Sequence, residues 1–312
     1  MSSGRVVIAT RQSQLALWQA NFIRDRLCES HPGLTVELLG MTTKGDQWLS
    51  APLAQVGGKG LFIKELEQAL MDRRADIAVH SVKDMPAQLG HGFVMPTVAF
   101  RDDVRDALVT ATGARLSELP AHARVGSSSL RRQAQLLMVR DDLDIAPIRG
   151  NVDTRLGKLD AGDFDAVVLA AAGLRRLGLA ERISEYLDVE TCLPAAGQGA
   201  LGIECRADDS AIKQLLLPLH DAQTFVTVTA ERAVSAGLGV DCSAPLAAYA
   251  TLEGRAIRLR ALLAAPDGTC VIRATAVGEE PLEVGASVAE SLRGQGAEDL
   301  LAVARAQQDE GL

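Results

Sequence analysis

Arginine residues recur at the ends of apolar segments, and their spacing is the strongest chemical signal in this chain. They occupy positions Arg11, Arg131, Arg132, Arg149, Arg155, Arg175 and Arg176. A guanidinium makes paired hydrogen bonds to carboxylate or phosphate oxygens and stays charged at physiological pH. The sequence therefore predicts that several of these arginines bind an anionic ligand.

The bulk of the chain has the opposite charge balance. It contains 32 Lys+Arg against 40 Asp+Glu, for a formal net charge of -8. A local group of guanidiniums in an acidic protein favours one specific anion over a general polyanion. Aromatic residues make up only 3% of the chain, so the stacking surfaces typical of nucleic-acid binding are not expected. We expect a small-molecule ligand and no nucleic-acid partner.

Two segments place arginines beside a predicted helix start. In Ser127–Arg132, three serines, which are typical helix N-caps, precede an arginine pair. In Arg149–Arg155, arginines lie on both sides of the helix start, and Gly150 permits close approach of the backbone to a ligand. The alternative for each segment is a capped helix with solvated arginines, and finding the pattern twice favours the ligand site.

Asp84 follows the apolar segment 76–80, which has the character of a buried strand. Ligands bind at the carboxyl ends of the strands in open α/β sheets, and an ionised carboxylate there would stabilise a developing cation. The alternative is a turn aspartate paired with Lys83. The neighbouring His80 is more typical of a packed core histidine than of a catalytic base.

The cysteines predict neither a disulfide framework nor a zinc site, because they are odd in number and widely spaced. They lie at positions 28, 192, 205, 242 and 270. Cys242 is in a polar, turn-rich segment, where exposure favours reactivity, whereas the adjacent Asp241 is expected to raise the pKa of its thiol. The residues alone leave open whether Cys242 is reactive or inert, and no metal is expected.

The elements that must position these residues alternate between strand and helix patterns. Strands are predicted at 6–10, 35–39, 76–80, 124–126, 145–148, 164–169 and 200–205. From about residue 220 the pattern changes to a helix at 225–236, strands at 246–252, 257–263 and 269–277, and two further helices. The chain is therefore predicted to be α/β, with two similar lobes and a small C-terminal α+β domain.

A chain of 312 residues that is 47% hydrophobic is long enough to form more than one core. The predicted first domain is 1–99 with 195–218, the second is 100–194 and the third is 219–312. Two crossings between the lobes, near 100 and near 195, would then serve as a hinge. The glycine-bearing loop at 44–60 is longer than a connector requires and is a candidate lid.

The predicted location is the cytoplasm. The apolar run at 6–9 is too short for a signal peptide, and no apolar stretch approaches the length of a membrane span. We therefore expect no membrane partner. The sequence has no long heptad pattern or large apolar edge, which favours a monomer.

Taken together, six segments resemble the porphobilinogen deaminase (hydroxymethylbilane synthase) family over nearly the whole chain. They are Thr10–Ala20, Gly57–Glu67, His80–Pro86, Ser128–Gln135, Arg149–Arg155 and Leu193–Ala200. The resemblance implies two lobes similar to periplasmic solute-binding proteins and a third domain. It also implies a dipyrromethane cofactor bound through a thioether to Cys242. The family often has Gly-Gly-Cys-Gln-Val-Pro where this chain has Val240–Pro245.

The implied activity is a transferase reaction of tetrapyrrole and heme biosynthesis. Four porphobilinogen molecules are deaminated and joined head to tail onto the dipyrromethane, and water then releases linear hydroxymethylbilane. Loss of ammonia from the aminomethylpyrrole gives an azafulvenium cation. The resemblance assigns Asp84 as the catalytic residue that would stabilise this cation and assist proton movement.

The resemblance also implies binding roles for a wider set of residues. Those expected to bind the cofactor are Ser81, Lys83, Ser128, Ser129, Arg131, Arg132, Gly150, Arg155 and Cys242. Those expected to bind the substrate are Arg11, Ser13, Lys59, Phe62, Arg149, Arg176 and Gln198. Each porphobilinogen brings an acetate and a propionate, which would account for arginines at several strand ends.

Two other classes of protein remain open from the residues alone. A two-lobed solute-binding or effector-sensing module would also have an arginine-lined cleft. It would need neither Asp84 nor Cys242 in a separate domain. A phosphotransfer enzyme would use the same guanidiniums with a metal-binding carboxylate pair, for which the sequence offers no convincing spacing.

Overall fold

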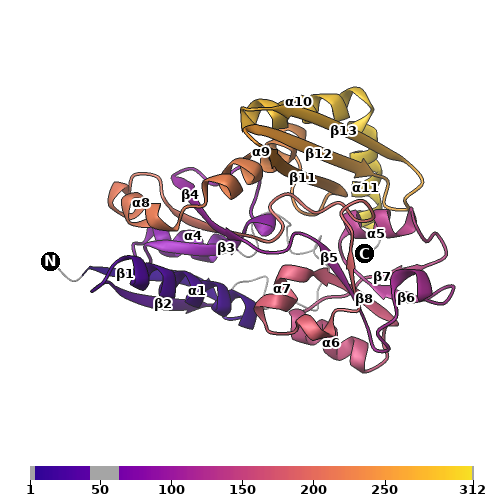
Figure 1. Ribbon diagram of the computed structural model, residues 1–312, viewed down its shortest axis with the longest axis horizontal. Helices are drawn as coiled ribbons and strands as arrows, with labels where there is room; N and C mark the ends of the chain where they lie inside the picture. The colour runs from indigo at the N-terminus through magenta and orange to yellow at the C-terminus, as the bar shows by residue number, and fades with distance from the viewer. Residues whose placement is uncertain (1–3, 43–62, 311–312) are drawn as a thin grey trace. The chain divides into compact units, whose positions relative to one another are not determined.

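The computed structural model describes residues 4–42 and 63–310, without the side chains of 308–310. The chain divides into two compact units (Figure 1). The first unit consists of Met1–Asp102 and Ala200–Phe225, and the second of Asp103–Gly199 and Val226–Leu312. The division into three domains stays a prediction, because the second lobe and the C-terminal elements form one compact unit here.

The first unit is built on a five-stranded sheet with the order β2-β1-β3-β10-β4. Its strands are β1 (Arg5–Arg11), β2 (Thr35–Met41), β3 (Ile77–Ser81), β4 (Phe93–Arg101) and β10 (Ala200–Arg206). Strands β2, β1 and β3 run parallel, whereas β10 is antiparallel to both of its neighbours. The carboxyl ends of β1 and β3 therefore lie at the same edge of the sheet.

Helices cover both faces of this sheet. They are α1 (Gln14–Ser30), α4 (Lys64–Met71) and α8 (Ser210–Leu216), with short 3-10 helices at Val82–Asp84 and Leu217–Leu219. On β1, Val6 and Ile8 join the core cluster of α1 and α8, whereas Val7 and Ala9 join the cluster of α4. This alternation follows from the two-residue period of a strand and explains why the centre of β1, at 6–9, is apolar on both faces.

The second unit contains a sheet with the same spatial arrangement of parallel and antiparallel strands. Its order is β7-β6-β8-β5-β9, with β6, β7 and β8 parallel and β5 antiparallel to both of its neighbours. The strands are β5 (Asp106–Thr110), β6 (Arg124–Gly126), β7 (Asp144–Ala146), β8 (Ala166–Ala170) and β9 (Glu185–Leu187). The prediction of an α/β chain with two similar lobes is confirmed.

The helices of the second lobe also divide between two faces of its sheet. They are α5 (Leu130–Leu137), α6 (Val152–Asp160) and α7 (Ala171–Arg176), with 3-10 helices at Leu116–Glu118 and Ala180–Arg182. Leu136 of α5 packs with Val125 and Val168. The α6 and α7 side chains pack in a separate cluster with Val167 and Leu169.

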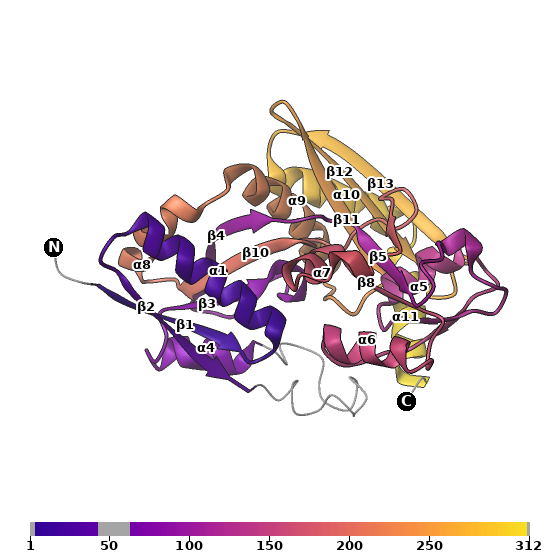
Figure 2. The same cartoon turned by 60° about the horizontal axis from the view of Figure 1, so that its bottom comes forward.

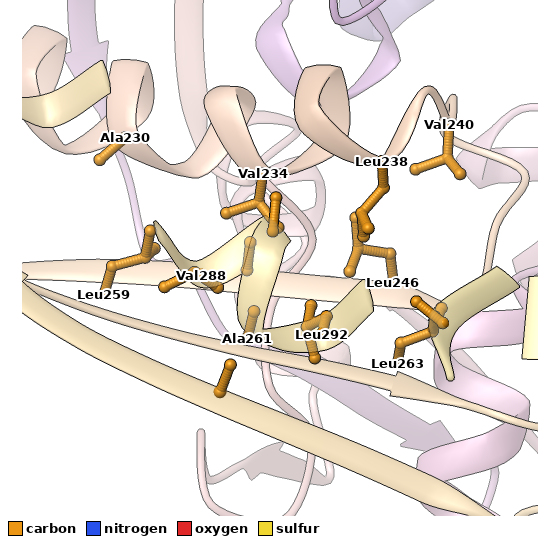
Figure 3. Packing of buried hydrophobic residues seen from close by; sticks show 14 of the residues in the cluster. Ala230, Val234, Leu238, Val240, Leu246, Leu259, Ala261, Leu263, Val288 and Leu292 are labelled. Atoms are coloured by element: carbon orange, nitrogen blue, oxygen red, sulfur yellow. The ribbon is translucent and has the colours of Figure 1, made fainter. Parts of the chain in front are cut away.

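The C-terminal elements form the predicted small α+β arrangement. They are α9 (Ala222–Leu238), β11 (Leu246–Glu253), β12 (Ala256–Ala264), β13 (Val271–Gly278), α10 (Pro281–Gly294) and α11 (Ala297–Glu310). The three strands form an antiparallel meander. Figure 3 shows Val234 and Leu238 of α9 facing a core that includes Leu259 and Leu263 of β12 and Leu292 of α10.

Within the second unit, the C-terminal sheet packs against α5. Ala134 of α5 shares a core cluster with Leu193 and Leu262. Gly268, in the turn between β12 and β13, has a φ of +75°, and a Cβ there would lie 2.9 Å from the carbonyl oxygen of Ala134. Only glycine allows this approach without displacing the helix. The α5 helix is thus packed against both the second-lobe sheet and the C-terminal sheet (Figure 2).

Candidate active site

Asp84 lies at the carboxyl end of β3, in a short 3-10 helix formed by Val82–Asp84. Val82 and the following Met85 are buried at 1% and 5% exposure, and the Met85 N–H donates to the Val82 carbonyl at 3.0 Å. These two apolar anchors fix the turn, and the Asp84 side chain remains exposed. A buried strand thus presents a solvent-accessible carboxylate at the sheet edge where ligands bind.

A pocket with a volume of about 70 Å³ lies at this edge of the first unit. Its polar lining includes Arg11 from the end of β1, Ser13 from the start of α1, and His80, Ser81 and Asp84 from β3 and its turn. Leu15, Ala16, Gln19, Ile63, Leu66 and Val79 complete the lining. The structure therefore brings together Arg11, Ser13, Ser81 and Asp84, as parallel β1 and β3 require.

The hydroxyl groups at this pocket are held by local hydrogen bonds. Ser13 is the N-cap of α1, and its Oγ accepts a hydrogen bond from the Ala16 N–H at 3.3 Å. The buried Gln19 donates from Nε2 to the Ser81 Oγ at 2.8 Å. These contacts join the start of α1 to the end of β3 and fix the orientation of both hydroxyls.

Three further residues of this part of the chain are predicted to bind cofactor or substrate. Lys83 lies in the same 3-10 helix as Asp84 and is half-buried. Lys59 and Phe62, together with the candidate lid at 44–60, lie outside the described residues. Their proposed roles in binding stay predictions.

In the second unit, serine hydroxyls organise the start of α5 as the sequence predicts. Ser129 is the N-cap, and its Oγ accepts from the Arg132 N–H at 3.4 Å. The Ser128 Oγ donates to the Ile148 carbonyl at 2.7 Å and accepts from the Ile148 N–H at 3.0 Å. Ser128 therefore ties this helix start to the end of the neighbouring segment, which leads into Arg149.

Arg131 and Arg132 bind the same carboxylate, that of Asp106 at the start of β5. Arg131 Nη2 lies 2.8 Å from Asp106 Oδ2, and Arg132 donates from Nε and Nη2 to Oδ1 at 2.9 and 2.8 Å. Asp106 is 0% exposed and the two arginines are 3% and 6% exposed. The alternative of solvated arginines is therefore wrong for this pair.

This group of three side chains has a formal charge of +1 at the N-terminal end of a helix. Cations are disfavoured there by the helix dipole, and the buried aspartate compensates for one of the two. Burial opposes the charge of Arg131, but attraction to Asp106 outweighs it and raises the pKa of the guanidinium. Burial, together with Asp106, raises the pKa of the adjacent Cys192 thiol to about 12.

The segment 192–199 is bound to this group as well. Gln198 donates from Nε2 to the Val104 carbonyl at 2.7 Å and to Asp106 Oδ1 at 3.0 Å. Arg131 Nη1 donates to the Leu193 carbonyl at 2.7 Å. The buried Arg176, at the end of α7, donates from Nη2 to the Gly199 carbonyl. Gln198 and Arg176 thus make internal contacts, and their predicted substrate contacts stay predictions.

Gly150 and Arg155 form a second local structure at the start of α6. Gly150 has a φ of +113°, and a Cβ there would lie 2.6 Å from the Thr154 Cβ. Arg155 donates from Nε to the Gly150 carbonyl at 2.8 Å. Arg149 precedes this turn and is half-buried. The tight turn therefore orients Arg155 and places Arg149 directly before it.

Cys242 is exposed in the turn between α9 and β11. Val240 before it is 8% exposed and Pro245 after it is buried, so the turn is anchored on both sides. Asp241 Oδ1 accepts hydrogen bonds from the N–H and the hydroxyl of Ser243 at 3.0 and 2.5 Å. The departure from the glycine-rich family pattern is thus accommodated by an aspartate that caps the turn, with the thiol at its surface.

Sequence reasoning did not single out Asp106, Gln19 or Glu204, which bind the predicted residues from inside. Asp106 is the first residue of β5 and follows Arg105 directly. In the sequence, this pair of charged residues resembles an ordinary polar turn. A strand that begins with a buried aspartate requires a buried cation. That requirement could have paired it with the arginines of α5.

The described residues contain no group of three or more His, Cys, Asp or Glu side chains that could hold a metal ion. Residues of the second unit do suit the binding of an acidic group that is attached covalently to the protein. Cys242 offers an exposed thiol on an anchored turn, and the Asp106 group carries excess positive charge at the start of α5. A dipyrromethane has both a point of attachment and carboxylates that such a charge would attract.

Two family models match this chain. The model "Porphobilinogen deaminase, dipyromethane cofactor binding domain" matches residues 6–214, and "Porphobilinogen deaminase, C-terminal domain" matches residues 225–294. A porphobilinogen deaminase of Syntrophotalea carbinolica is 52% identical over 304 residues, which cover 97% of this chain and 96% of that protein.

Several solved structures are similar at low sequence identity. The VFT2 domain of BvgS from Bordetella pertussis is 16% identical over 69% of this chain and 86% of that one, with a TM-score of 0.41. The extracellular-binding protein ytmK of a probable amino-acid ABC transporter from Bacillus subtilis is 11% identical over 70% and 90%, with a TM-score of 0.43.

Proposed function

The chain belongs to the porphobilinogen deaminase family of transferases, and from that premise we propose that Asp84 is its catalytic residue. The family acts in tetrapyrrole biosynthesis, and its substrate is porphobilinogen. The pocket that joins Arg11, Ser13 and Ser81 to Asp84 carries this proposal. A cation and two oriented hydroxyls beside one exposed carboxylate suit a substrate with acidic side chains and a cationic amine.

The two ends of such a substrate require opposite charges. Arg11 and the Ser13 hydroxyl supply donors for an acetate or propionate. Asp84 supplies a carboxylate for the cationic carbon that remains when the aminomethyl nitrogen leaves as ammonia. Because Val82 and Met85 anchor the turn, the Asp84 carboxylate is oriented before the substrate arrives.

In the second unit, we propose that Cys242 holds the dipyrromethane through a thioether. When bound, this cofactor supplies the primer to which each substrate is joined. Ser129, Arg132, Arg149 and Arg155 would bind its carboxylates from two helix starts. Arg131 would contribute indirectly, because it binds the same Asp106 carboxylate that orients Arg132.

We also propose that the chain acts as a monomer in the cytoplasm. The sequence pattern supports the monomer, since it offers no long heptad seam. Over residues 4–42 and 63–310, no helix is long and apolar enough to cross a membrane. Sedimentation analysis across a range of concentrations would measure the oligomeric state, and a concentration-dependent dimer would contradict the monomer.

The catalytic role of Asp84 is tested by Asp84→Asn, which removes the charge but keeps the shape of the side chain. We expect the rate of tetrapyrrole formation to fall by about 10²–10⁴-fold. Asp25→Asn is the matched control, because Asp25 is an exposed carboxylate on α1 of the same unit and does not line the pocket. Asp84 would lose its proposed role if both variants kept the normal rate.

The attachment of the cofactor is tested by intact-mass measurement of the denatured protein. We expect a mass above that of the polypeptide in the unsubstituted protein and the plain polypeptide mass in Cys242→Ser. Cys270→Ser is the control, since Cys270 is also an exposed thiol of the second unit. An added mass that persists in Cys242→Ser would place the attachment elsewhere.

A further inference from the structure

A buried histidine and glutamate lie behind the pocket of the first unit. His80 Nε2 is 2.9 Å from Glu204 Oε2, with His80 at 8% and Glu204 at 0% exposure. His80 is also one of the residues that line the pocket containing Asp84 and Arg11. A histidine that contacts a buried carboxylate on one side and a polar pocket on the other differs from the packed core histidine that the sequence favours.

The strand geometry explains how the pair is held. Glu204 on β10 is directly opposite Ala78 on β3, and His80 lies two residues further along the same face. This is the face where Ala78 packs against α4. Because both side chains project from strands in the centre of the sheet, neither can reorient without disrupting the core.

The contact also fixes the tautomer of the ring. Nε2 must carry a proton to donate to the Glu204 carboxylate. Nδ1 then becomes the ring atom that gains or loses a proton, and it makes no hydrogen bond within the described part of the chain. A carboxylate that orients an imidazole in this way is the recurring device by which proteins prepare a histidine for proton transfer.

Charged groups surround the pair on both sides of the ring. Glu204 Oε1 is buried without a hydrogen bond among the described residues, so a neutral imidazole leaves this carboxylate poorly compensated. On α4, burial and then repulsion from Glu204 raise the pKa of Glu67, while Lys64 opposes this. Arg11 and Asp84 are the charged side chains on the pocket side.

We propose that His80, oriented by Glu204, is a proton-transfer residue of this pocket. It uses the same pocket as the proposed function, but it does not depend on the role of Asp84. Among the described residues that line the pocket, His80 is the only imidazole. Glu204 is a positioning residue, because it acts on the pocket only through the ring.

The proton balance of the reaction gives this ring a task. With a protonated substrate amine, each condensation breaks one C–N bond and one C–H bond and forms one C–C bond. It releases ammonia and one proton. Nδ1 would accept that proton while Nε2–H stays on Glu204, and the ring would then return it to the departing ammonia to give ammonium. No external acid, base or oxidant is required.

The tautomer is tested by nitrogen NMR of the full-length protein with labelled histidine, without substrate. We expect the His80 signals to show the ring proton on Nε2 and not on Nδ1. Glu204→Gln should remove the preference for one tautomer. A ring that carries its proton on Nδ1 would overturn the proposal whatever the activity.

The catalytic consequence is tested with His80→Gln, whose amide can still donate to Glu204. We expect kcat to fall by about 10²-fold with little change in KM, and the pH dependence of kcat to lose one ionisation. His31→Gln is the control, because His31 contacts the Leu215 carbonyl in the same unit, away from the pocket. An unchanged pH profile in a folded His80→Gln protein would refute the proposal.

These outcomes separate the two proposals. A normal rate in Asp84→Asn together with a lowered rate in His80→Gln would contradict the catalytic role of Asp84 and support the proton-transfer role of His80. The reverse pattern would keep Asp84 and reduce the His80–Glu204 pair to a structural contact. Thermal unfolding of each variant verifies that a change in rate does not reflect loss of the fold.

Discussion

Arginine and aspartate meet in two regions of this molecule, with opposite results. In the first unit, Arg11 and Asp84 line an open pocket, and Asp84 is exposed. In the second unit, Arg131 and Arg132 enclose Asp106, and all three side chains are buried. The same residue types thus form a ligand-accessible site in one unit and an internal ion cluster in the other.

Burial accounts for the difference. A charge removed from water needs compensating partners inside the protein, so Asp106 receives hydrogen bonds from both arginines and from Gln198. An exposed carboxylate such as Asp84 is stabilised by water until a ligand replaces it. The comparison teaches that a buried acid reduces the positive charge that an arginine pair at a helix start offers to a ligand.

The largest expected effect comes from Asp106→Asn. Asparagine is uncharged and has one acceptor oxygen, so both buried guanidiniums would lose their anionic partner and one would also lose its hydrogen-bond acceptor. We expect the free energy of unfolding to fall by about 3–5 kcal/mol, as measured by urea denaturation. Asp84→Asn, by contrast, should change it by less than about 0.5 kcal/mol.

Asp142→Asn is the matched control for this loss of stability. Asp142 pairs with Arg140 at 2.7 Å in the same unit, but both side chains are partly exposed. We expect a cost below about 1 kcal/mol, as is typical of surface ion pairs. Equal losses in Asp106→Asn and Asp142→Asn would break the distinction between the buried and the accessible region.

A smaller loss of stability is expected at Arg155, whose hydrogen bond goes to a backbone carbonyl and not to a carboxylate. Gly150→Ala forces a side chain onto a φ of +113° and against Thr154. We expect a loss of about 1–3 kcal/mol, with displacement of Arg155. Gly157→Ala, within α6 and with open space around its Cβ, should instead stabilise by about 0.5–1 kcal/mol.

If Gly150→Ala proved as stable as Gly157→Ala, the turn would not be the constraint on Arg155. Calorimetric unfolding of both variants measures this difference. Crystallography of the alanine variant would then show whether the Arg155 contact to the residue 150 carbonyl persists.

The smallest effect concerns the Cys192 thiol and pH. Its pKa is about 12 in the folded protein against an ordinary value of 9.0, because of burial and Asp106. The unfolded chain therefore loses the thiol proton first as pH rises above 9. Stability should fall by about 1.4 kcal/mol between pH 9 and pH 10 from this group alone.

Cys192→Ala should remove this contribution to the alkaline slope, whereas Cys28→Ala, at an exposed position, should leave the slope unchanged. Denaturant unfolding at several pH values up to about 10 measures both. Identical slopes in the two variants would show that the thiol at 192 does not share the buried environment of Asp106.

The sequence predicted most of the strands because their apolar pattern is local. β6 was predicted at its observed bounds, and β1, β3 and β10 within one or two residues. β4, β5 and β9 were not predicted. β5 and β9 are short, and they become strands through antiparallel pairing with segments far away in the chain, a contribution that a local pattern does not contain.

The pocket of the first unit was predictable for a similar reason. Arg11 and Asp84 both follow parallel strands, and the carboxyl ends of adjacent parallel strands meet at one edge. The role of Asp106 was not predictable from its own segment, since it depends on where α5 packs. The predicted loop around Lys59 and Phe62 lies outside the described residues and stays a prediction.

The sequence by itself determined the family, the two-lobed α/β class and the positions of the arginines, because motifs and periodicity are properties of neighbouring residues. The tertiary structure decided which of those charges remain accessible. Burial depends on residues that are distant in the chain, such as Asp106 for Arg132 and Glu204 for His80. A charge keeps water as its partner at the surface, whereas in the interior the folded chain must supply that partner.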